Sequence, residues 1–296
     1  MSAPRGRTAG RFRLRSELRQ RREDAGLTQG QAATAMEWSL SKLVRIEAGT
    51  VGISVNDLRA LLALYGVRDQ DQIDELLAVA RTAKQRVWWT QYRDLLAQPY
   101  LEFIGCEADA ATIRYFHPTV VPGSCQTEDY ARAIIANGGP DELTPEEAGP
   151  RLAVRMTRIK ELFDRPDKPT LTVLLDEAVI RRPIGGPAVM RAQLHHLATL
   201  ATRANVTIGV IPFAAGVHPG LYGSFVLFDF ADPADEGVLY VEQAQTQMVL
   251  RDRPDHVAQY HRVFDRLAAI ALSQQDTIAL LLRAADELPP PPTPSI

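Results

Sequence analysis

Residues 27–49 constrain the fold of this chain most strongly, because they hold two helix starts separated by a tight turn. Thr28 can act as an N-cap while Gln31 reaches back three residues to form a capping box. Ser39 offers a second N-cap only a few residues after the first helix must end. The residues that would pack the two helices together are Ala32, Ala33, Met36, Trp38, Leu43 and Ile46. This spacing predicts a helix-turn-helix that binds DNA, and the alternative is an ordinary helical hairpin.

The flanking residues extend this pattern to a helical domain of about five helices. A first helix is expected to end near Gly26, and Ser54 with Asp57 predicts another capping box. Apolar residues then recur at helical spacing, at Leu58, Leu61, Leu62 and Tyr65 and again at Ile73, Leu76, Leu77 and Ala80. We therefore expect an all-α domain over residues 14–83.

Residues 14–67 resemble the lambda-repressor/Cro (XRE) class of regulators. The resemblance is carried by AGLTQ (25–29), SLSKLVRIEAG (39–49) and DLRALLALYGV (57–67). One residue departs from the class, which usually has Gly in the turn where this chain has Glu37. That position often needs a positive φ, so we expect backbone strain of about 1 kcal/mol there.

The recognition helix is expected over residues 39–48, beginning at Ser39. Leu40, Ser41 and Arg45 are the predicted contacts to base edges, with Arg45 donating to guanine and Leu40 contacting a thymine methyl. Gln29 and Lys42 are expected to hold phosphates. Glu47 gains nothing beside a phosphate, so we expect it to orient a neighbouring Arg or to cap a helix end. We expect a homodimer on double-stranded DNA with an inverted-repeat operator.

The distribution of charge agrees with one module that faces nucleic acid. Residues 1–50 contain ten Lys and Arg against five Asp and Glu, a net charge of +5, which leaves −8 for the rest of the 296-residue chain. Phosphate contacts dominate DNA affinity, so residues 1–13 are interpreted as a basic arm. A length of 296 residues suits two domains.

Residues 84–286 are expected to form an α+β domain with a mixed sheet, followed by a Pro-rich tail at 287–296. The expected strands are Ala111–Phe116, Thr170–Leu175, Val206–Pro212, Ser224–Phe230 and Val238–Glu242. The expected helices are Gln126–Ala136, Thr144–Phe163, Pro187–Ala204, Asp255–Leu272 and Gln274–Ala285.

This second region resembles the C-terminal domain of actinobacterial XRE regulators that are described as antitoxin-like and include WhiJ-like proteins. The resemblance is carried in order by WWTQYRD, VPGSCQTEDYARA, LLDEAVIRRPIGG, QLHHLATLA, NVTIGVIPFAAGVHPGLYGSFVLFDF and LYVEQA. It implies transcriptional control, often with a small partner protein encoded nearby. Ser124 and Cys125 stand where the family usually has two leucines, which makes that turn smaller and more polar.

Nothing in the second region predicts an enzyme, a metal site or a cofactor. His195 and His196 are adjacent on a helix and point about 100° apart, so they do not readily share one metal. Asp176 and Glu177 follow a strand without a nucleophile or phosphate loop, and nearby arginines can neutralise them. Cys106 and Cys125 are expected to be buried free thiols. No apolar run is long enough to span a membrane, so the expected location is the cytoplasm.

Two roles of the second domain remain open. It could bind a small effector in a cavity formed by Ala214–Gly223 and Pro122–Thr127, and the candidate contacts there are Ser124, Cys125, Gln126, His218 and Tyr222. It could instead bind a protein, either a second copy or a small neighbour that it sequesters while autoregulating its operon. The stripe of Val257, Tyr260, Phe264, Leu267 and Ala271 could pair with another helix, or it could belong to the domain's own core.

Overall fold

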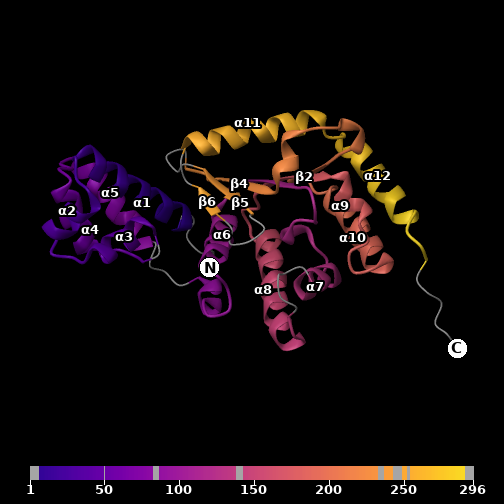
Figure 1. Ribbon diagram of the computed structural model, residues 1–296, viewed down its shortest axis with the longest axis horizontal. Helices are drawn as coiled ribbons and strands as arrows, with labels where there is room; N and C mark the ends of the chain where they lie inside the picture. The colour runs from indigo at the N-terminus through magenta and orange to yellow at the C-terminus, as the bar shows by residue number, and fades with distance from the viewer. Residues whose placement is uncertain are drawn as a thin grey trace. The chain divides into compact units, whose positions relative to one another are not determined.

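The computed structural model describes residues 7–49, 51–82, 87–137, 143–232, 237–242, 249–251 and 254–290. The chain divides into two compact units (Figure 1). The first unit contains Met1–Asp109 with Phe230–Glu236, and the second contains Ala110–Asp229 with Gly237–Ile296.

The first unit is helical in its described residues, as the sequence predicts. Its elements are α1 (Arg7–Asp24), α2 (Gln29–Ala35), α3 (Leu40–Glu47), α4 (Val55–Leu64), α5 (Gln70–Thr82), the 3₁₀ helix η1 (Trp88–Tyr92) and α6 (Gln98–Asp109). The five helices α1 to α5 and the turn between α2 and α3 confirm the expected helix-turn-helix arrangement.

The helix starts follow the expected capping chemistry with one exception. Thr28 and Gln31 form the complete capping box of α2, and the Ser39 hydroxyl accepts a hydrogen bond from the Lys42 amide at the start of α3. Ser54 caps α4 by accepting from the Asp57 amide. The capping box expected for Ser54 and Asp57 is therefore only half formed. The Asp57 carboxylate accepts a hydrogen bond from the Lys42 ammonium group instead of from the Ser54 amide.

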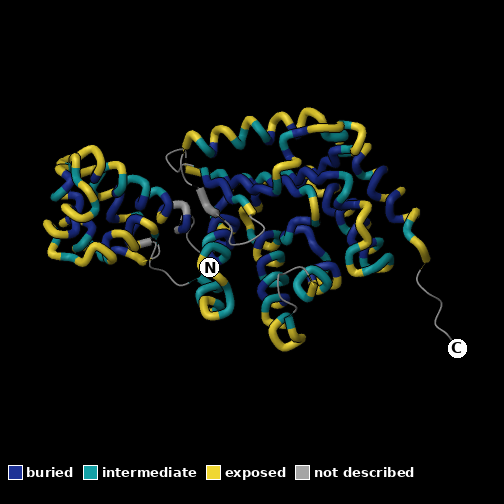
Figure 2. Tube along the Cα trace, in the orientation of Figure 1, coloured by how far each residue is buried: buried dark blue, intermediate teal, exposed yellow. Residues whose placement is uncertain are grey.

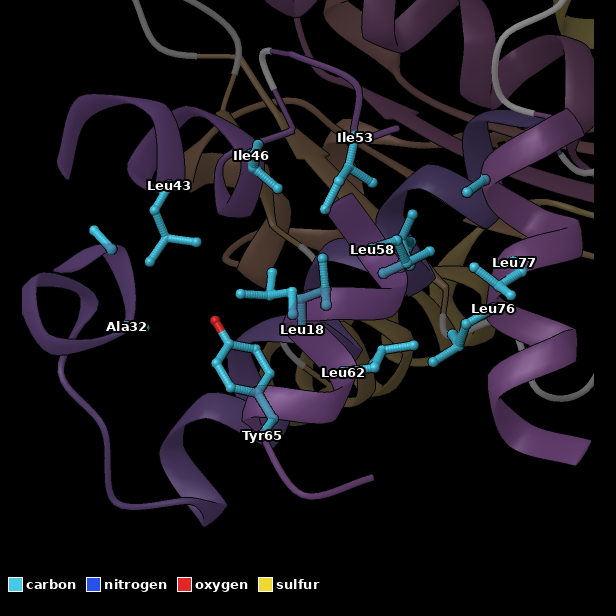
Figure 3. Packing of buried hydrophobic residues seen from close by; sticks show 14 residues of the cluster. Leu18, Ala32, Leu43, Ile46, Ile53, Leu58, Leu62, Tyr65, Leu76 and Leu77 are labelled. Carbon is cyan, nitrogen blue, oxygen red and sulfur yellow. The ribbon is translucent and has the colours of Figure 1, made fainter. Parts of the chain in front are cut away.

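The core of the first unit joins α1 to α5 through leucines and small residues (Figure 3). The labelled side chains of Leu18, Leu43, Leu58, Leu62 and Tyr65 come from α1, from α3 and from α4 with its C-cap, and they belong to one buried cluster. Ala32 and Ala33 are buried where α2 packs on α3, so the absence of a larger side chain allows the close approach. This core holds α3 rigidly relative to the rest of the domain.

Two boundaries differ from those expected. Residues 7–13 of the expected basic arm form the beginning of α1, while residues 1–6 lie outside the described residues. The helix α6 was not expected, and residues up to Asp109 belong to the first unit, whereas the second domain was expected to begin at residue 84.

The second unit is built on a mixed sheet, which confirms the expected fold class. Its strands are β1 (Thr112–His117), β2 (Thr170–Asp176), β3 (Val206–Ile211), β4 (Phe225–Asp229), β5 (Val238–Val241) and β6 (Val249–Arg251), in the order β3-β2-β1-β4-β5-β6. The strands β1, β2 and β3 are parallel, and β4, β5 and β6 continue the sheet in antiparallel pairs. The three-residue strand β6 was not expected from the sequence.

Helices cover the sheet of the second unit on both faces (Figure 1). They are α7 (Glu128–Asn137), α8 (Pro145–Asp164), α9 (Glu177–Arg181), α10 (Pro187–Leu200), α11 (Pro254–Ile270) and α12 (Gln274–Asp286), with the 3₁₀ turns η2 (Gly123–Cys125), η3 (Phe213–Ala215) and η4 (Pro219–Tyr222). The tube in Figure 2 shows buried strands beneath α11, whose outer side is exposed.

The apolar stripe on α11 belongs to the core of the second unit. Val257, Phe264 and Leu267 are buried against Phe116 and Leu227 of the sheet. Of the two interpretations of this stripe, the one that assigns it to the domain's own core is therefore confirmed, with Tyr260 and Ala271 partly buried against the same cluster. The described part of the expected tail follows α12, and the Arg191 guanidinium donates hydrogen bonds to the carbonyls of Leu288 and Pro289.

Candidate nucleic-acid interface

The recognition helix α3 separates its residues cleanly into an inner and an outer face. Leu43, Ile46 and Glu47 are buried, while Leu40, Ser41, Val44 and Arg45 are exposed. Ser39, the expected first residue, stands at the N-cap and is exposed, and Ala48 forms the C-cap. All the expected base contacts on α3 thus lie on the side that faces away from the core.

The outer face of α3 carries apolar side chains beside a cation. Leu40 is 52% exposed and Val44 is 38% exposed, so two aliphatic side chains on this face are open to solvent. Arg45 lies on the same face, and its Nε donates to the Ser41 carbonyl at 3.2 Å. Thymine methyls and guanine edges are the groups that such side chains recognise in a major groove. Val44 was missed from the sequence, although its spacing of four residues from Leu40 places both on one face.

A buried ion pair anchors the inner face of α3 to α1. The Arg22 guanidinium donates to both carboxylate oxygens of Glu47, at 2.7 Å and 3.2 Å, and it also donates to the Leu27 carbonyl. The Glu47 side chain is 1% exposed. Its hydrogen bonds to Arg22 raise the pKa of the arginine above its ordinary value, and desolvation of the guanidinium partly opposes this effect. Glu47 thus lies beside an arginine, as its chemistry suggested, and it fixes the orientation of α3.

Gln29 takes part in this network as well as lying at the start of α2. Its Nε2 donates to Oε2 of Glu47 at 2.8 Å, and its side chain is half-buried. The Gln29 side chain, which was expected to hold a phosphate, is therefore held in place by Glu47, the residue that anchors α3. A phosphate bound there would be positioned relative to α3 rather than by a loose side chain.

Lys42 is positioned by two neighbours outside its own helix. Its Nζ lies 3.7 Å from the centre of the Trp38 ring and 3.3 Å from Oδ2 of Asp57. These contacts hold the ammonium group at the edge of the outer face, between the turn and α4. Trp38 therefore packs the turn and orients the cation that was expected to hold a phosphate.

The turn before α3 contains a residue with positive φ, and the end of α3 is capped by arginines of α1. Glu37 has a φ of 56°, the positive value expected for the position where the class usually has Gly. At the other end of the helix, Arg15 donates to the Ala48 carbonyl and Arg19 donates to the Glu47 carbonyl. These two arginines satisfy carbonyls that have no partner within the helix.

The candidate contacts of the second unit fall in two places. Ser124, Cys125 and Gln126 are buried beside α8 and α10, where Gln126 Nε2 donates to the Val121 carbonyl and Gln193 Nε2 donates to the Cys125 carbonyl. The smaller side chains at 124 and 125 therefore fit a closely packed turn.

His218 and Tyr222 lie on the loop that contains η4, but their environments are opposite. His218 is buried, and its Nε2 lies 3.3 Å from Oδ2 of Asp176. Tyr222 is 97% exposed. Asp176 also caps α9 by accepting from the Ala178 amide, so its carboxylate has a structural partner at each oxygen. Of the candidate contacts in the second unit, Tyr222 is therefore the one most available to a partner.

Glu177, which follows Asp176 at the start of α9, is bonded to a side chain and to the backbone. The Glu177 carboxylate accepts hydrogen bonds from Arg181 and from the Phe213 amide. Among the residues that the structure describes, no group of three or more His, Cys, Asp or Glu could hold a metal ion. Within that same part of the chain, no helix is both long and apolar enough to cross a membrane.

Two family models match different parts of the chain. Residues 100–283 match a family whose model is described as a domain of unknown function (DUF5753). The chain belongs to this family. Residues 13–76 match a second model, described as a helix-turn-helix domain, which indicates DNA binding. The pairing is consistent with an XRE-like regulator that carries a C-terminal domain, as the resemblances in the sequence predicted. Comparison with curated proteins and with solved structures found no match.

Proposed function

We propose that this protein is a sequence-specific transcriptional regulator that binds an inverted-repeat operator as a homodimer. The observation that carries the proposal is the outer face of α3, where Leu40, Val44 and Arg45 are exposed on a helix anchored from behind by Glu47. A rigid helix with a mixed apolar and cationic face is suited to reading base edges in a major groove. The protein would act in the cytoplasm and associate with the nucleoid when bound to DNA.

The dimer follows from the way helix-turn-helix domains gain affinity. One short recognition helix contacts few base pairs, and two copies on a two-fold symmetric site double the contacts. Footprinting on the DNA upstream of the protein's own gene tests this directly, with the mass of the complex measured by light scattering. We expect an inverted repeat with half-sites about one helical turn apart and two chains bound. A single footprint without symmetry, bound by one chain, would contradict the dimer.

A second function is favoured by an exposed apolar surface on the second unit. Phe213, Val217, Leu221 and Tyr222 are all at least 59% exposed on the loop formed by η3 and η4. Clustered exposed aromatic and aliphatic side chains mark protein interaction surfaces more often than single exposed residues do. We propose as the alternative that this loop holds a small partner protein encoded nearby, in the manner of an antitoxin.

Light scattering with the product of the neighbouring gene separates this alternative from the binding of a small effector. A stable complex of added protein mass, lost in Tyr222→Ser and retained in Arg132→Gln, supports the protein partner. Arg132 is a suitable control because it is an exposed residue of α7 in the same unit. An unchanged mass at all concentrations would contradict the alternative.

We also propose that the chain is not an enzyme. This proposal is supported by the structural hydrogen bonds of the two carboxylates that follow β2. Asp176 caps a helix, and Glu177 accepts hydrogen bonds from Arg181 and from a backbone amide. Groups committed to such structural bonds are poor general acids or bases.

A further inference from the structure

The first unit contains a cavity of about 380 Å³ that the DNA-reading face of α3 does not use. Its wall is formed by α1, by the segment that leaves α3, and by the segment from Val87 to Glu102. The volume lies at the lower end of the range of about 300–1,000 Å³ that is typical of small-molecule sites. The cavity is therefore large enough for a ligand of one or two rings.

The residues that line the cavity combine apolar surface with an excess of cations. Phe12, Ile53, Trp89 and Leu101 provide aromatic and aliphatic surface. Among the described lining residues, the charged side chains are Arg11, Arg15, Arg93 and Glu102. Three guanidinium groups against one carboxylate favour an anionic ligand, and a guanidinium matches a carboxylate with two parallel hydrogen bonds. The ring surfaces favour a flat apolar body.

Arg15 connects this cavity with the recognition helix. It is buried, its guanidinium carbon lies 3.9 Å above the Phe12 ring, and its Nη1 donates to the Ala48 carbonyl at the C-cap of α3 at 3.3 Å. A Cβ atom at Gly49 would come within 3.2 Å of the same side chain. A carboxylate that binds Arg15 would thus act on a group that touches the end of α3.

We propose that this cavity binds a small aromatic carboxylic acid, and that its occupancy changes the affinity of α3 for DNA. The second part rests on the proposed function as a DNA-binding regulator. The site differs from the cavity expected in the second domain around Ala214–Gly223, because it lies within the first unit and adjoins the recognition helix itself.

The binding test uses the full chain and matched pairs of probes. Benzoate, salicylate and indole-3-acetate are compared with their amides by ligand-observed NMR and by tryptophan fluorescence. The acid and the amide have nearly the same shape, so a difference in affinity reports the charge. We expect at least one acid to bind at millimolar concentration or below and to bind about tenfold more tightly than its amide.

Three variants localise the binding. Gly52→Phe should abolish it, because Gly52 lines the cavity, and a Cβ atom built there meets no atom within 4 Å. Arg93→Gln should weaken the acid but leave the amide nearly unchanged. Gly149→Phe is the matched control, since Gly149 is exposed on α8 of the second unit and its Cβ would also meet nothing within 4 Å. Binding that survives Gly52→Phe, equal binding of acid and amide, or no binding by any of the acids below about 10 mM would overturn the site.

A separate measurement tests the regulatory part. The affinity for the footprinted DNA is measured with and without a saturating acid, in the wild type and in Gly52→Phe. We expect the acid to change the dissociation constant about threefold or more in the wild type and to have no effect in Gly52→Phe. An unchanged constant at saturation would overturn the coupling, even where the acid binds. Failure of DNA binding in the absence of any acid would instead contradict the proposed function.

Discussion

At the scale of single residues, Arg45 is predicted to be the side chain on which specific reading of DNA depends most. It is exposed on the outer face of α3, and a guanidinium can donate to both acceptors of a guanine. We expect Arg45→Ala to cost about 1–3 kcal/mol on the cognate site and to relax the preference at one base pair. Competition binding against duplexes with each base at that position measures both effects.

Arg45→Lys provides the control for this prediction. Lysine keeps the positive charge but loses the planar pair of donors, so the base preference should weaken while the salt dependence stays nearly constant. An equal loss of affinity on every sequence in Arg45→Ala would show that Arg45 contacts only phosphate.

The buried carboxylate of Glu47 is predicted to be the residue that stabilises the first unit most through polar contacts. Its removal takes away the two hydrogen bonds that the buried Arg22 guanidinium makes to a buried carboxylate, leaving Arg22 with the more exposed Glu23 and the Leu27 carbonyl, and it removes the partner of Gln29. We expect Glu47→Ala to lower the free energy of unfolding of this unit by about 3–5 kcal/mol, as for other broken buried pairs. Urea denaturation followed by helical circular dichroism measures the loss.

A double substitution distinguishes the ion pair from simple packing. Arg22→Met with Glu47→Leu removes both charges and keeps apolar volume, so it should cost less than Glu47→Ala alone. The account would be contradicted if the double variant lost as much unfolding free energy as the losses of Arg22→Met and Glu47→Leu, measured singly, added together.

At the scale of elements, the turn between α2 and α3 is predicted to carry strain at Glu37. Its φ of 56° is unfavourable for a residue with a Cβ atom, whereas glycine adopts it freely. We expect Glu37→Gly to raise the free energy of unfolding by up to about 1 kcal/mol. Gly26→Ala is the reverse control, because Gly26 has a φ of 68° and its Cβ would meet no other atom. A lower stability of Glu37→Gly in denaturation would show that the turn is not strained.

The end of β1 is predicted to make the second unit sensitive to acid. Desolvation lowers the pKa of the buried His117, with Arg158 adding to the effect and Glu242 opposing it, and desolvation also lowers the pKa of His196 on α10. The unfolded chain therefore binds more protons, so the stability contributed by neutral histidine is lost as the pH falls below about 6.5.

Substitution of the histidine measures this effect. We expect His117→Gln to flatten the dependence of the unfolding free energy on pH between about pH 5 and 7, by up to about 1.4 kcal/mol per pH unit. Identical slopes for the wild type and His117→Gln would contradict the prediction.

The elements also show what sequence could and could not predict. Capping chemistry located α2, α3 and α8, because Thr28, Ser39 and Thr144 bond to amides within three residues of themselves. The strand β6 was missed, since three residues are too few for an alternating pattern. The apolar stripe on α11 was compatible with a partner helix or with the domain's own core. Only the position of the sheet, which covers the stripe, distinguishes the two.

At the scale of the whole molecule, the helix-turn-helix match covers residues 13–76, in the part of the chain where the charge asymmetry predicted a module that faces nucleic acid. The exposed side of α3 could be predicted because Leu43 and Ile46 mark the inner face. The contacts of Gln29 with Glu47, and of Lys42 with Trp38 and Asp57, could not be predicted from the sequence, because folding brings these residues together. The cavity in the first unit was also missed, since its wall joins residues from Thr8 to Glu102.

The central claim is that the outer face of α3 reads base sequence, and one binding measurement tests it most directly. The affinity of the purified protein is measured for the footprinted duplex and for a scrambled duplex of the same composition, over a series of salt concentrations. We expect the footprinted site to bind at least about 10³-fold more tightly, with both affinities falling steeply as salt increases. Equal affinities for the two duplexes at every salt concentration would contradict the claim.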